Sequence, residues 1–286
     1  MRWQMGRRSD NVEDRRGSSG SRGGVVVGGG LGVLLMAIAA MFLGIDPSIV
    51  LQQAAPPDQG SYSDSPVSRS AEEEELAEFV SVILGYTEDT WKSIFRERGK
   101  TYIEPKLVLF TDAVDSACGY AQAATGPFYC PRDQKVYIDL GFYKQMKYQL
   151  NAPGDFAQAY VIAHEVGHHV QTLLGISQQV SSLQRQVSQT QANQLSVRLE
   201  LQADCFAGVW ASRTQQAQNI LERGDVEEAL NAASSIGDDR LQRQSQGYVV
   251  PDTFTHGTSA QRVRWFKRGL QTADIDECNT FETQSL

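Results

Sequence analysis

The longest uncharged stretch of the chain covers residues 23–45 and reads GGVVVGGGLGVLLMAIAAMFLGI. In a helix, at about 1.5 Å per residue, it extends roughly 34 Å, and the hydrocarbon core of a bilayer is about 30 Å thick. Residues 23–45 are therefore predicted to form one transmembrane helix. A cleaved signal peptide is the alternative, but its apolar core is usually only about 7–15 residues long and is followed by a cleavage site.

The residues on either side of this stretch predict an orientation. Residues 1–22 contain six arginines and three acidic residues, so the positive-inside rule predicts a basic cytoplasmic tail. Residues 46–71 are rich in Pro, Ser, Gln and Asp, which is typical of a flexible linker. Residues 72–286 then form one domain on the periplasmic or extracytoplasmic side, and the whole is expected to be a single-pass membrane protein.

The composition excludes two further classes of protein. The chain carries 26 basic and 34 acidic side chains, a net charge of −8, whereas nucleic-acid-binding domains present a basic surface. No nucleic-acid partner is expected. The charged fraction of 21% is also too high for a protein that crosses a membrane many times.

Hydrophobic periodicity predicts many helices and few strands. The predicted strands are 106–110 and 135–139, and residues 119–131 are expected to form a loop. The predicted helices are 72–84, 88–98, 155–174, 177–190, 193–216, 225–236 and 259–271, with Asp155 as an N-cap. This pattern indicates an α+β fold, a mostly helical domain with a small β-sheet.

Four cysteines, without a CxxC pair, favour two disulfide bonds in an oxidising compartment. We expect Cys118 to pair with Cys130, closing a short loop, and Cys205 to pair with Cys278. Four buried free thiols are the alternative, and would be favoured if the domain were cytoplasmic.

Three of the four histidines lie in one hexapeptide, HEVGHH at residues 164–169. His164 and His168 are four residues apart, so on a helix both imidazoles project from one face. This spacing lets two ring nitrogens bind one zinc ion, and Glu165, about 100° further round the helix, is placed to act as a general base. The surrounding residues are apolar, and burying these groups without a metal would be costly. A chance match on a surface helix is the alternative.

A catalytic zinc site needs a third protein ligand. The third histidine of HExxHxxGxxH proteins is missing, because Gln171 and Leu174 occupy the Gly and His positions. Glu200 and Asp204 share one face of a later predicted helix. We expect Glu200 to bind zinc and Asp204 to accept the free ring N–H of His164. The reverse assignment and an exposed acidic helix face stay open as alternatives.

The segments HEVGHHVQ and ELQADCFAGVW resemble the gluzincin pattern, HExxH followed by ExxxD. From about residue 72 onward the chain resembles, more narrowly, the bacterial family of putative neutral zinc metallopeptidases. The other segments that carry this likeness are CG at 118–119, GPFYCP at 126–131, VYIDL at 136–140, HGTSAQR at 256–262 and WF at 265–266. The resemblance implies a zincin-like fold after one N-terminal membrane segment. It also implies His164, His168 and Glu200 as zinc ligands and Glu165 as catalytic base.

Two further expectations concern substrate and catalysis. Zincins generally hold an extended peptide along an edge strand, and Lys135–Asp139 is the candidate; an ordinary interior strand is the alternative. His256, the only histidine outside the hexapeptide, or Arg262 is a candidate to stabilise the oxyanion. A capping or packing role is the alternative for His256.

These observations predict a membrane-anchored zinc-dependent peptidase, most simply an endopeptidase, that binds one Zn²⁺ per chain and acts on a peptide or protein substrate. A non-catalytic envelope protein, which binds zinc structurally and interacts with a partner, is the alternative. In that protein a fourth ligand would close the site to water.

Overall fold

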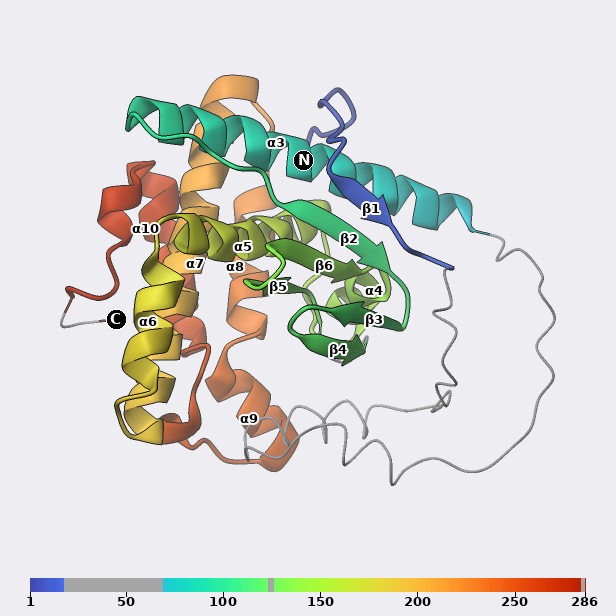
Figure 1. Cartoon of the computed structure of the whole chain (residues 1–286). Helices are drawn as coiled ribbons and strands as arrows, with labels where there is room; N and C mark the ends of the chain where they lie inside the picture. The colour runs from blue at the N-terminus through green and yellow to red at the C-terminus, as the bar shows by residue number, and fades with distance from the viewer. Residues whose placement is uncertain (18–68, 123–125, 284–285) are drawn as a thin grey trace, which may run out of the picture.

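The computed structural model describes residues 1–17, 69–122, 126–283 and 286. Within these residues, eight α-helices form a helical body, and one four-stranded and one two-stranded sheet lie at its side (Figure 1). The prediction of a mostly helical α+β domain with a small sheet is confirmed. The predicted membrane helix 23–45 lies outside the described residues. Among the helices that are described, none combines the length and the apolar character needed to cross a bilayer.

The bounds of the elements are as follows. The strands are β1 (Val12–Asp14), β2 (Lys106–Phe110), β3 (Ala113–Ser116), β4 (Gly119–Gln122), β5 (Phe128–Cys130) and β6 (Lys135–Asp139). The helices are α3 (Ala71–Glu97), α4 (Gly141–Tyr148), α5 (Asp155–Leu173), α6 (Ile176–Gln184), α7 (Gln189–Gln218), α8 (Asp225–Ser235), α9 (Asp238–Gln246) and α10 (Ser259–Thr272). In the described part of the chain, two short 3₁₀ helices span Pro251–Thr253 and Ile275–Cys278.

Both predicted strands have the bounds expected from sequence, and α5 ends within one residue of its prediction. The predicted helices 72–84 and 88–98 are instead one helix, α3, which begins with a capping box between Ser70 and Glu73. The helix continues through Gly85 because this glycine is buried against the chain's N-terminal residues. Asp155 is not the N-cap of α5; Gly154 occupies that position.

The four-stranded sheet has the order β1-β2-β6-β5. β1, β2 and β6 are parallel, and β5 is antiparallel to β6. The candidate substrate strand Lys135–Asp139 is β6, which is hydrogen-bonded on both sides, so that expectation is wrong. The edge on this side of the described sheet is β5, which lies within the stretch 119–131 predicted to be a loop. β5 pairs with β6 as a hairpin across residues 131–134, and its strand is only three residues long, too short to give a clear alternating pattern in the sequence.

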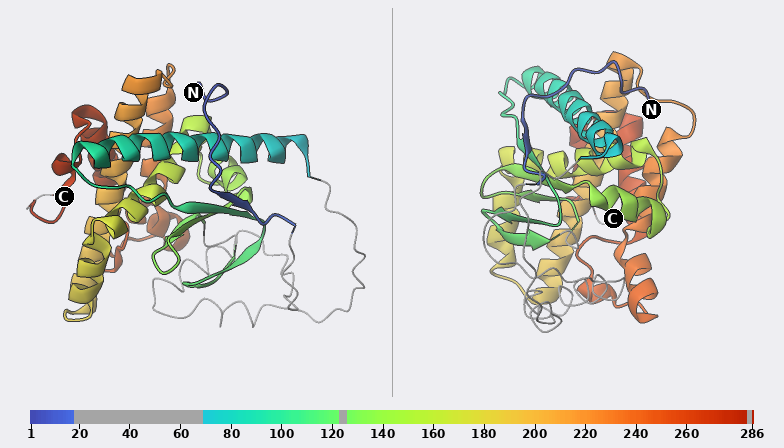
Figure 2. Two further views of the ribbon diagram at one scale, coloured as in Figure 1. Left: turned by 45° about the horizontal axis from the view of Figure 1, so that its top comes forward. Right: turned by 90° about the vertical axis from the view of Figure 1, so that its right-hand side faces the viewer.

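The N-terminal residues are part of the domain. They cross α3 and then form β1 at the edge of the sheet (Figures 1 and 2). Trp3 packs edge-on against Phe79, with ring centroids 5.4 Å apart. A Cβ atom on Gly85 would lie 2.4 Å from the carbonyl oxygen of Arg7, which shows how closely the two segments pack. The prediction of a tail separate from the domain is therefore wrong for residues 1–17.

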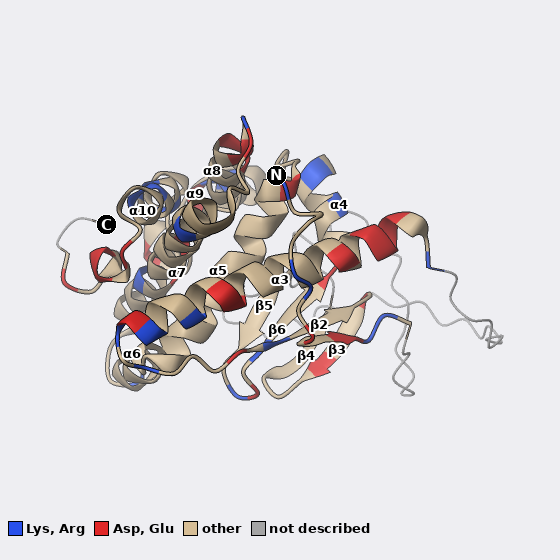
Figure 3. Ribbon diagram, turned by 90° about the horizontal axis from the view of Figure 1, so that it is seen from above, with Lys and Arg blue, Asp and Glu red and all other residues tan. Residues whose placement is uncertain are grey.

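Polar contacts hold this segment as well. Glu88 of α3 is only 1% exposed, and its carboxylate accepts hydrogen bonds from Arg7 at 2.7 Å and from Asn11 at 2.9 Å. Ser9 donates to the same carboxylate. Figure 3, in which α3 is seen from above, shows basic residues of the segment beside acidic residues of this helix. A buried carboxylate is costly without such partners, so the first residues complete the fold of α3.

All four cysteines are paired as predicted. Cys118–Cys130 joins the turn between β3 and β4 to the end of β5. Cys205–Cys278 joins α7 to the 3₁₀ helix near the C-terminus. Cys205 comes directly after Asp204 in the sequence. The second bond therefore ties the C-terminal segment to the helix that carries the predicted ligand Glu200.

Candidate metal centre

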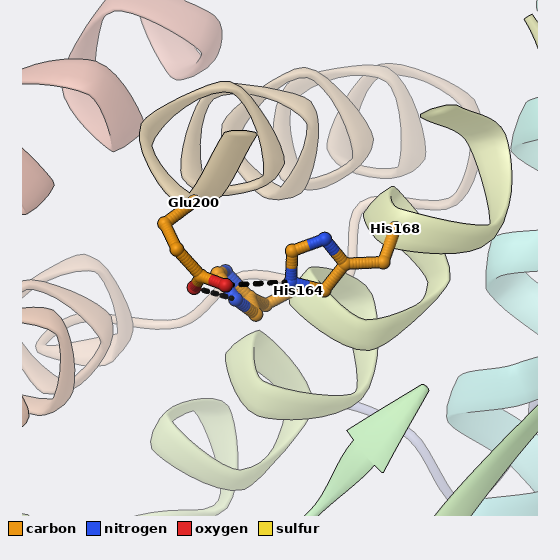
Figure 4. Close-up of side chains that lie close together, drawn as sticks. All are labelled: His164, His168 and Glu200. Atoms are coloured by element: carbon orange, nitrogen blue, oxygen red, sulfur yellow. Dashed lines mark hydrogen bonds and ion pairs between the residues drawn. The ribbon is translucent and has the colours of Figure 1, made fainter. Parts of the chain in front are cut away.

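Helices α5 and α7 bring the three predicted ligands together (Figure 4). The Nε2 atom of His164 lies 3.1 Å from Oε2 of Glu200, and Nε2 of His168 lies 3.4 Å from Oε1 of the same carboxylate. One ligand atom from each residue lies within 4.8 Å of the others. Two imidazole nitrogens and a carboxylate oxygen therefore converge on one point.

The close approach of the two helices depends on Gly167, between the two histidines. A Cβ atom at this position would lie 3.1 Å from the carbonyl oxygen of Ala203 and 3.2 Å from its Cα. The glycine thus lets the backbone of α7 pass directly over α5. Glu200, one turn before Ala203, is carried over the face that bears His164 and His168.

Asp204 lies on the other side of His164. Its Oδ1 is 2.9 Å from Nδ1 of that ring, and it also accepts the hydroxyl proton of Tyr160. Arg262 of α10 donates to both carboxylate oxygens, from Nε and from Nη2, each at 2.9 Å. Asp204 and Tyr160 are fully buried and Arg262 is 2% exposed. The guanidinium of Arg262 is therefore engaged by Asp204, which argues against a direct role on an oxyanion.

His168 has a neutral partner instead. Its Nδ1 lies 2.9 Å from Oε1 of Gln171, one turn further along α5. Both Nδ1 atoms of the histidine pair are thus engaged by acceptors of the protein, so both Nε2 atoms point toward Glu200. This is the arrangement in which neutral imidazoles present lone pairs to a cation.

The charges of the cluster are strongly coupled. Burial lowers the pKa of His164, but the carboxylates of Asp204 and Glu200 outweigh it and raise the pKa to about 10. Burial raises the pKa of Glu200, but His168 and His164 hold it well below its ordinary range. Glu200 therefore stays ionised, and a cation that binds here takes the place of imidazole protons.

The remaining members of the motif are placed differently. Glu165 follows His164 on α5 and is 8% exposed. His169 lies away from the cluster between Tyr102 and Tyr129, with Nε2 2.7 Å from the carbonyl oxygen of Ile103 and Nδ1 3.1 Å from the Tyr129 hydroxyl. His169 is therefore a buried packing residue.

His256 lies on the loop before α10, held by Asp238. Its side chain is 47% exposed, and Nδ1 is 3.2 Å from Oδ1 of Asp238. The other carboxylate oxygen accepts the backbone N–H groups of His256 and Gly257 at 2.6 and 3.0 Å. Partial removal from water lowers the pKa of His256, but Asp238 and the charge of Glu200 raise it above its ordinary value. His256 thus belongs to the electrostatic surroundings of Glu200.

A second acidic group, formed by Asp155, Asp225 and Glu228, has a different character. The amino group of Met1 lies 2.8 Å from Asp155 and 3.4 Å from Asp225. This group contains only carboxylates, whereas zinc sites are usually built from imidazole or thiolate ligands.

Sequence reasoning did not identify Tyr160, Gln171, Gln202 or Asp238. Gln171 carried a signal, because it stands three residues after His168 on a helix and so lies on the same side. Asp238 and Tyr160 carried no such signal. Asp238 on α9 meets His256 on the loop before α10, and Tyr160 on α5 meets Asp204 on α7. Both contacts depend on how separate segments pack.

The chain is similar to two uncharacterized bacterial proteins. The chain is 56% identical to the uncharacterized protein YpfJ of Escherichia coli over 289 residues, which cover 98% of this chain and 99% of the relative. It is 38% identical to the uncharacterized protein Rv2575 of Mycobacterium tuberculosis, with 86% of each chain covered. No solved structure matches it.

The family model described as "Putative neutral zinc metallopeptidase" matches residues 1–281. The match includes the N-terminal residues that pack on α3, the histidine motif and Glu200. The chain therefore belongs to the putative neutral zinc metallopeptidase family.

Proposed function

We propose that this protein is a zinc-dependent peptidase, with His164, His168 and Glu200 as the ligands of one zinc ion and Glu165 as the general base. The observation that carries the proposal is the convergence of two Nε2 atoms and one ionised carboxylate within 4.8 Å. Membership of the zinc metallopeptidase family supports the same reaction class.

The residues fit zinc. The donor set, two imidazole nitrogens and one carboxylate oxygen, is that of catalytic zinc sites with an open fourth position. The Nδ1 atoms are engaged by Asp204 and Gln171. This leaves the two Nε2 atoms as the ring nitrogens that can bind the metal. A structural site would be expected to use four protein ligands, and only three residues form this group among those described.

In the proposed reaction Glu165 moves protons. Zinc held by His164, His168 and Glu200 would supply a Lewis acid, which polarises a carbonyl and lowers the pKa of a bound water toward about 7. Glu165 accepts the proton of the attacking water and then passes it to the leaving amine. Asp204 and Gln171 keep the two imidazoles in place throughout.

His256 is proposed to stabilise the oxyanion of the tetrahedral intermediate. Its Nδ1 faces Asp238, so the protonated ring is free to donate from Nε2. Its raised pKa, caused by Asp238 and Glu200 against the effect of burial, favours that protonated form. Replacing His256 with Ala is expected to lower kcat more than it raises KM, since the charge develops only in the transition state.

The substrate is proposed to bind along β5. This strand is the edge of the described sheet beside β6, and an extended peptide can add to it through main-chain hydrogen bonds. Cys118–Cys130 fixes the end of β5, so the strand is held in place before a peptide arrives.

The decisive experiment compares the purified protein with its Glu165→Gln variant. The variant is expected to retain zinc, because Glu165 is not a ligand, and to cleave peptides at least about 100-fold more slowly. Glu227→Gln, an exposed position on α8, is the matched control and is expected to cleave at the wild-type rate. Full zinc occupancy without cleavage of any peptide library would contradict the proposal and favour a zinc-binding interaction protein. Comparing cleaved peptide termini in wild-type and Glu165→Gln cells would then identify substrates.

The compartment of the domain is proposed separately. The two disulfide bonds support an oxidising compartment outside the cytoplasm. Because β1 pairs with β2, residues 1–17 lie on the same side of a membrane as the domain whenever this pairing is formed. One crossing by residues 23–45 would place them on opposite sides, so a cytoplasmic N-terminus requires β1 to leave β2. We therefore amend the predicted topology: residues 1–17 are placed outside with the domain, and a single crossing by residues 23–45 is no longer proposed.

Single cysteines at exposed positions test this arrangement. Met5 is 98% exposed and Tyr248 is 63% exposed, and the native cysteines are all in disulfides. In spheroplasts, Met5→Cys and Tyr248→Cys should both react with a membrane-impermeant maleimide. Labelling of Tyr248→Cys alone would restore the cytoplasmic N-terminus, and labelling of neither would place the domain in the cytoplasm.

A further inference from the structure

We propose that Gln171 and Gln202 form a hydrogen-bonded chain that positions His168 as a metal ligand, anchored at the backbone of Cys278. The inference rests on the metal site of the proposed function and deepens it. It assigns to two neutral amides the task that Asp204 performs for His164.

The orientation of the Gln171 amide follows from its neighbours. One end of this amide lies 2.7 Å from the carbonyl oxygen of Leu199. A carbonyl oxygen only accepts, so the atom that faces it is the amide nitrogen, Nε2. The oxygen, Oε1, therefore faces Nδ1 of His168 at 2.9 Å. An amide oxygen cannot donate, so the proton of the His168 ring sits on Nδ1.

This tautomer is the one that metal binding requires. With the proton on Nδ1, the lone pair of the neutral His168 ring is on Nε2, the atom that lies 3.4 Å from Glu200. The orientation is set before any cation arrives, because the acceptor at Leu199 belongs to the backbone of α7. The same helix carries Glu200, one residue later.

Gln202 fixes the amide of Gln171 in turn. Its Nε2 donates to the carbonyl oxygen of Cys278 at 3.0 Å, so its Oε1 is the atom that accepts from Gln171 at 3.1 Å. Gln171 is 1% exposed and Gln202 is 4% exposed. Water has little access to these amides, so a lost hydrogen bond is not readily replaced.

The chain of hydrogen bonds ends at a covalent anchor. Cys278 is bonded to Cys205 of α7, and its carbonyl is therefore held against the helix that supplies Gln202. All donors point one way, from His168 through Gln171 and Gln202 to Cys278. Reversing any one amide would place two donors or two acceptors face to face.

The two histidines are thus positioned by partners of different charge. Asp204 is a buried anion that is itself paired with Arg262, and an anionic acceptor raises the basicity of the His164 ring. Gln171 is neutral and adds little basicity to His168. Its contribution is the orientation of the ring and the choice of the nitrogen that faces the metal.

The test measures zinc affinity by competition with a chromogenic chelator, and the proton on Nδ1 of His168 by nitrogen NMR of the zinc-loaded protein with labelled histidine. Gln171→Met, which is similar in size but accepts no comparable hydrogen bond, is expected to lower zinc affinity by about 10- to 100-fold. It should also lose the slowly exchanging Nδ1–H signal of His168, which a change in general stability alone would not remove.

Two further variants separate positioning from stability. Gln242 is also a buried, hydrogen-bonded glutamine, on α9 and outside the chain of hydrogen bonds, so Gln242→Met is the matched control and should bind zinc as the wild type does. Gln202→Met keeps the contact between Gln171 and His168 but removes the anchor of Gln171. It should lower the zinc affinity by about 3- to 10-fold, which is less than the loss expected when the contact with His168 is itself removed. It keeps the inference testable if Gln171→Met does not fold.

The outcomes are distinct. Zinc affinity within twofold of the wild type in both Gln171→Met and Gln202→Met, with the Nδ1–H signal retained, would overturn the inference. Weakening in Gln242→Met equal to that in Gln171→Met would also overturn it. A wild-type protein that binds zinc and depends on Gln171, yet cleaves no peptide, would contradict the proposed peptidase activity and leave the positioning role standing.

Discussion

Nδ1 of His164 lies 2.9 Å from Oδ1 of Asp204, at the centre of a buried network that joins three helices. Tyr160 and His164 come from α5, Asp204 from α7 and Arg262 from α10. The helices α7 and α10 are close enough for this contact because of two glycines, Gly208 of α7, where a Cβ atom would lie 2.1 Å from the carbonyl oxygen of Phe266, and Gly269 of α10. A Cβ atom on Gly269 would lie 1.9 Å from the carbonyl oxygen of Cys205. The position of a candidate metal ligand therefore depends on a packing contact outside the metal site.

Replacing Asp204 with Asn should weaken zinc binding by about 10- to 100-fold, because His164 loses its anionic acceptor. The same change leaves the guanidinium of Arg262 buried without its partner, and breaking a buried ion pair costs about 3–5 kcal/mol of the free energy of unfolding. Chelator competition measures the first effect and denaturant unfolding the second. Arg262→Met removes the opposite charge and should lose similar stability. Unchanged zinc affinity in Asp204→Asn would show that the contact does not serve the metal.

Replacing Gly85 with Ala should release the N-terminal segment from α3. Ala favours a helix by about 1 kcal/mol over Gly, yet its Cβ would lie 2.4 Å from the carbonyl oxygen of Arg7. Overpacking costs about 1–3 kcal/mol, so after the gain in helix propensity we expect a net loss of up to about 2 kcal/mol in the free energy of unfolding. Hydrogen exchange of residues 2–16 should become faster.

The control for this change is Glu75→Ala, an exposed position on the same helix. It should leave exchange of the N-terminal residues unchanged. If Gly85→Ala stabilised the protein, the close packing of residues 1–17 on α3 would be contradicted.

The pairing of Glu13 with Lys135 should make β1 sensitive to acid. The hydrogen bond from Lys135, helped by Arg15, lowers the pKa of Glu13 below its unfolded value of 4.5, although burial opposes the shift. A group with a lowered pKa contributes stability above the unfolded pKa, and this contribution disappears as the pH falls through the folded pKa. Lys135 is at 2.8 Å and both side chains are less than one third exposed.

Comparing the wild type with Glu13→Gln tests the direction of this pH dependence of stability. At pH 7 the wild type should be more stable by less than about 1 kcal/mol, and the difference should shrink toward zero below pH 4.5. Unfolding by denaturant at several pH values measures it. A difference that grows as the pH falls would refute the assignment.

The two disulfide bonds should differ in their effect on stability and on zinc. Cys205–Cys278 closes a loop with a sequence separation of 73, and Cys118–Cys130 one of 12. Loop entropy predicts a loss of about 4 kcal/mol on removing the first and about 3 kcal/mol on removing the second. Double alanine variants at each pair serve as controls for one another. Zinc affinity should fall only without Cys205–Cys278, since Gln202 is anchored at the carbonyl of Cys278.

Much of the site could be predicted because it is encoded locally. The spacing of His164 and His168 fixes their common helix face, and Glu200 and Asp204 repeat the same spacing. The partners that orient these groups could not be predicted in the same way. Tyr160, Arg262 and Asp238 reach their contacts across separate helices, and sequence distance carries no information on which helix faces which.

The sheet shows the same division. The strands at 106–110 and 135–139 were predictable, because each is an apolar run bounded by turn residues. The edge strand β5 and the N-terminal strand β1 were not, because each is only three residues long. In addition, β1 pairs with β2, which is distant in sequence, whereas β5 forms a hairpin with β6.

By itself, the sequence determined the elements and the chemistry: a histidine motif with helical spacing, a downstream glutamate, and four cysteines to be paired. Periodicity and residue type suffice for these features because they act over one or two helical turns. Only the tertiary structure decided which edge of the sheet is open, how each imidazole is oriented, and that the first residues belong to the domain. The open edge follows from the pairing of β5 with β6. The placing of the helices that carry the imidazoles, and of the first residues, depends on close backbone contacts at Gly85, Gly167 and Gly269, where the absence of a side chain matters only once another segment is packed against it.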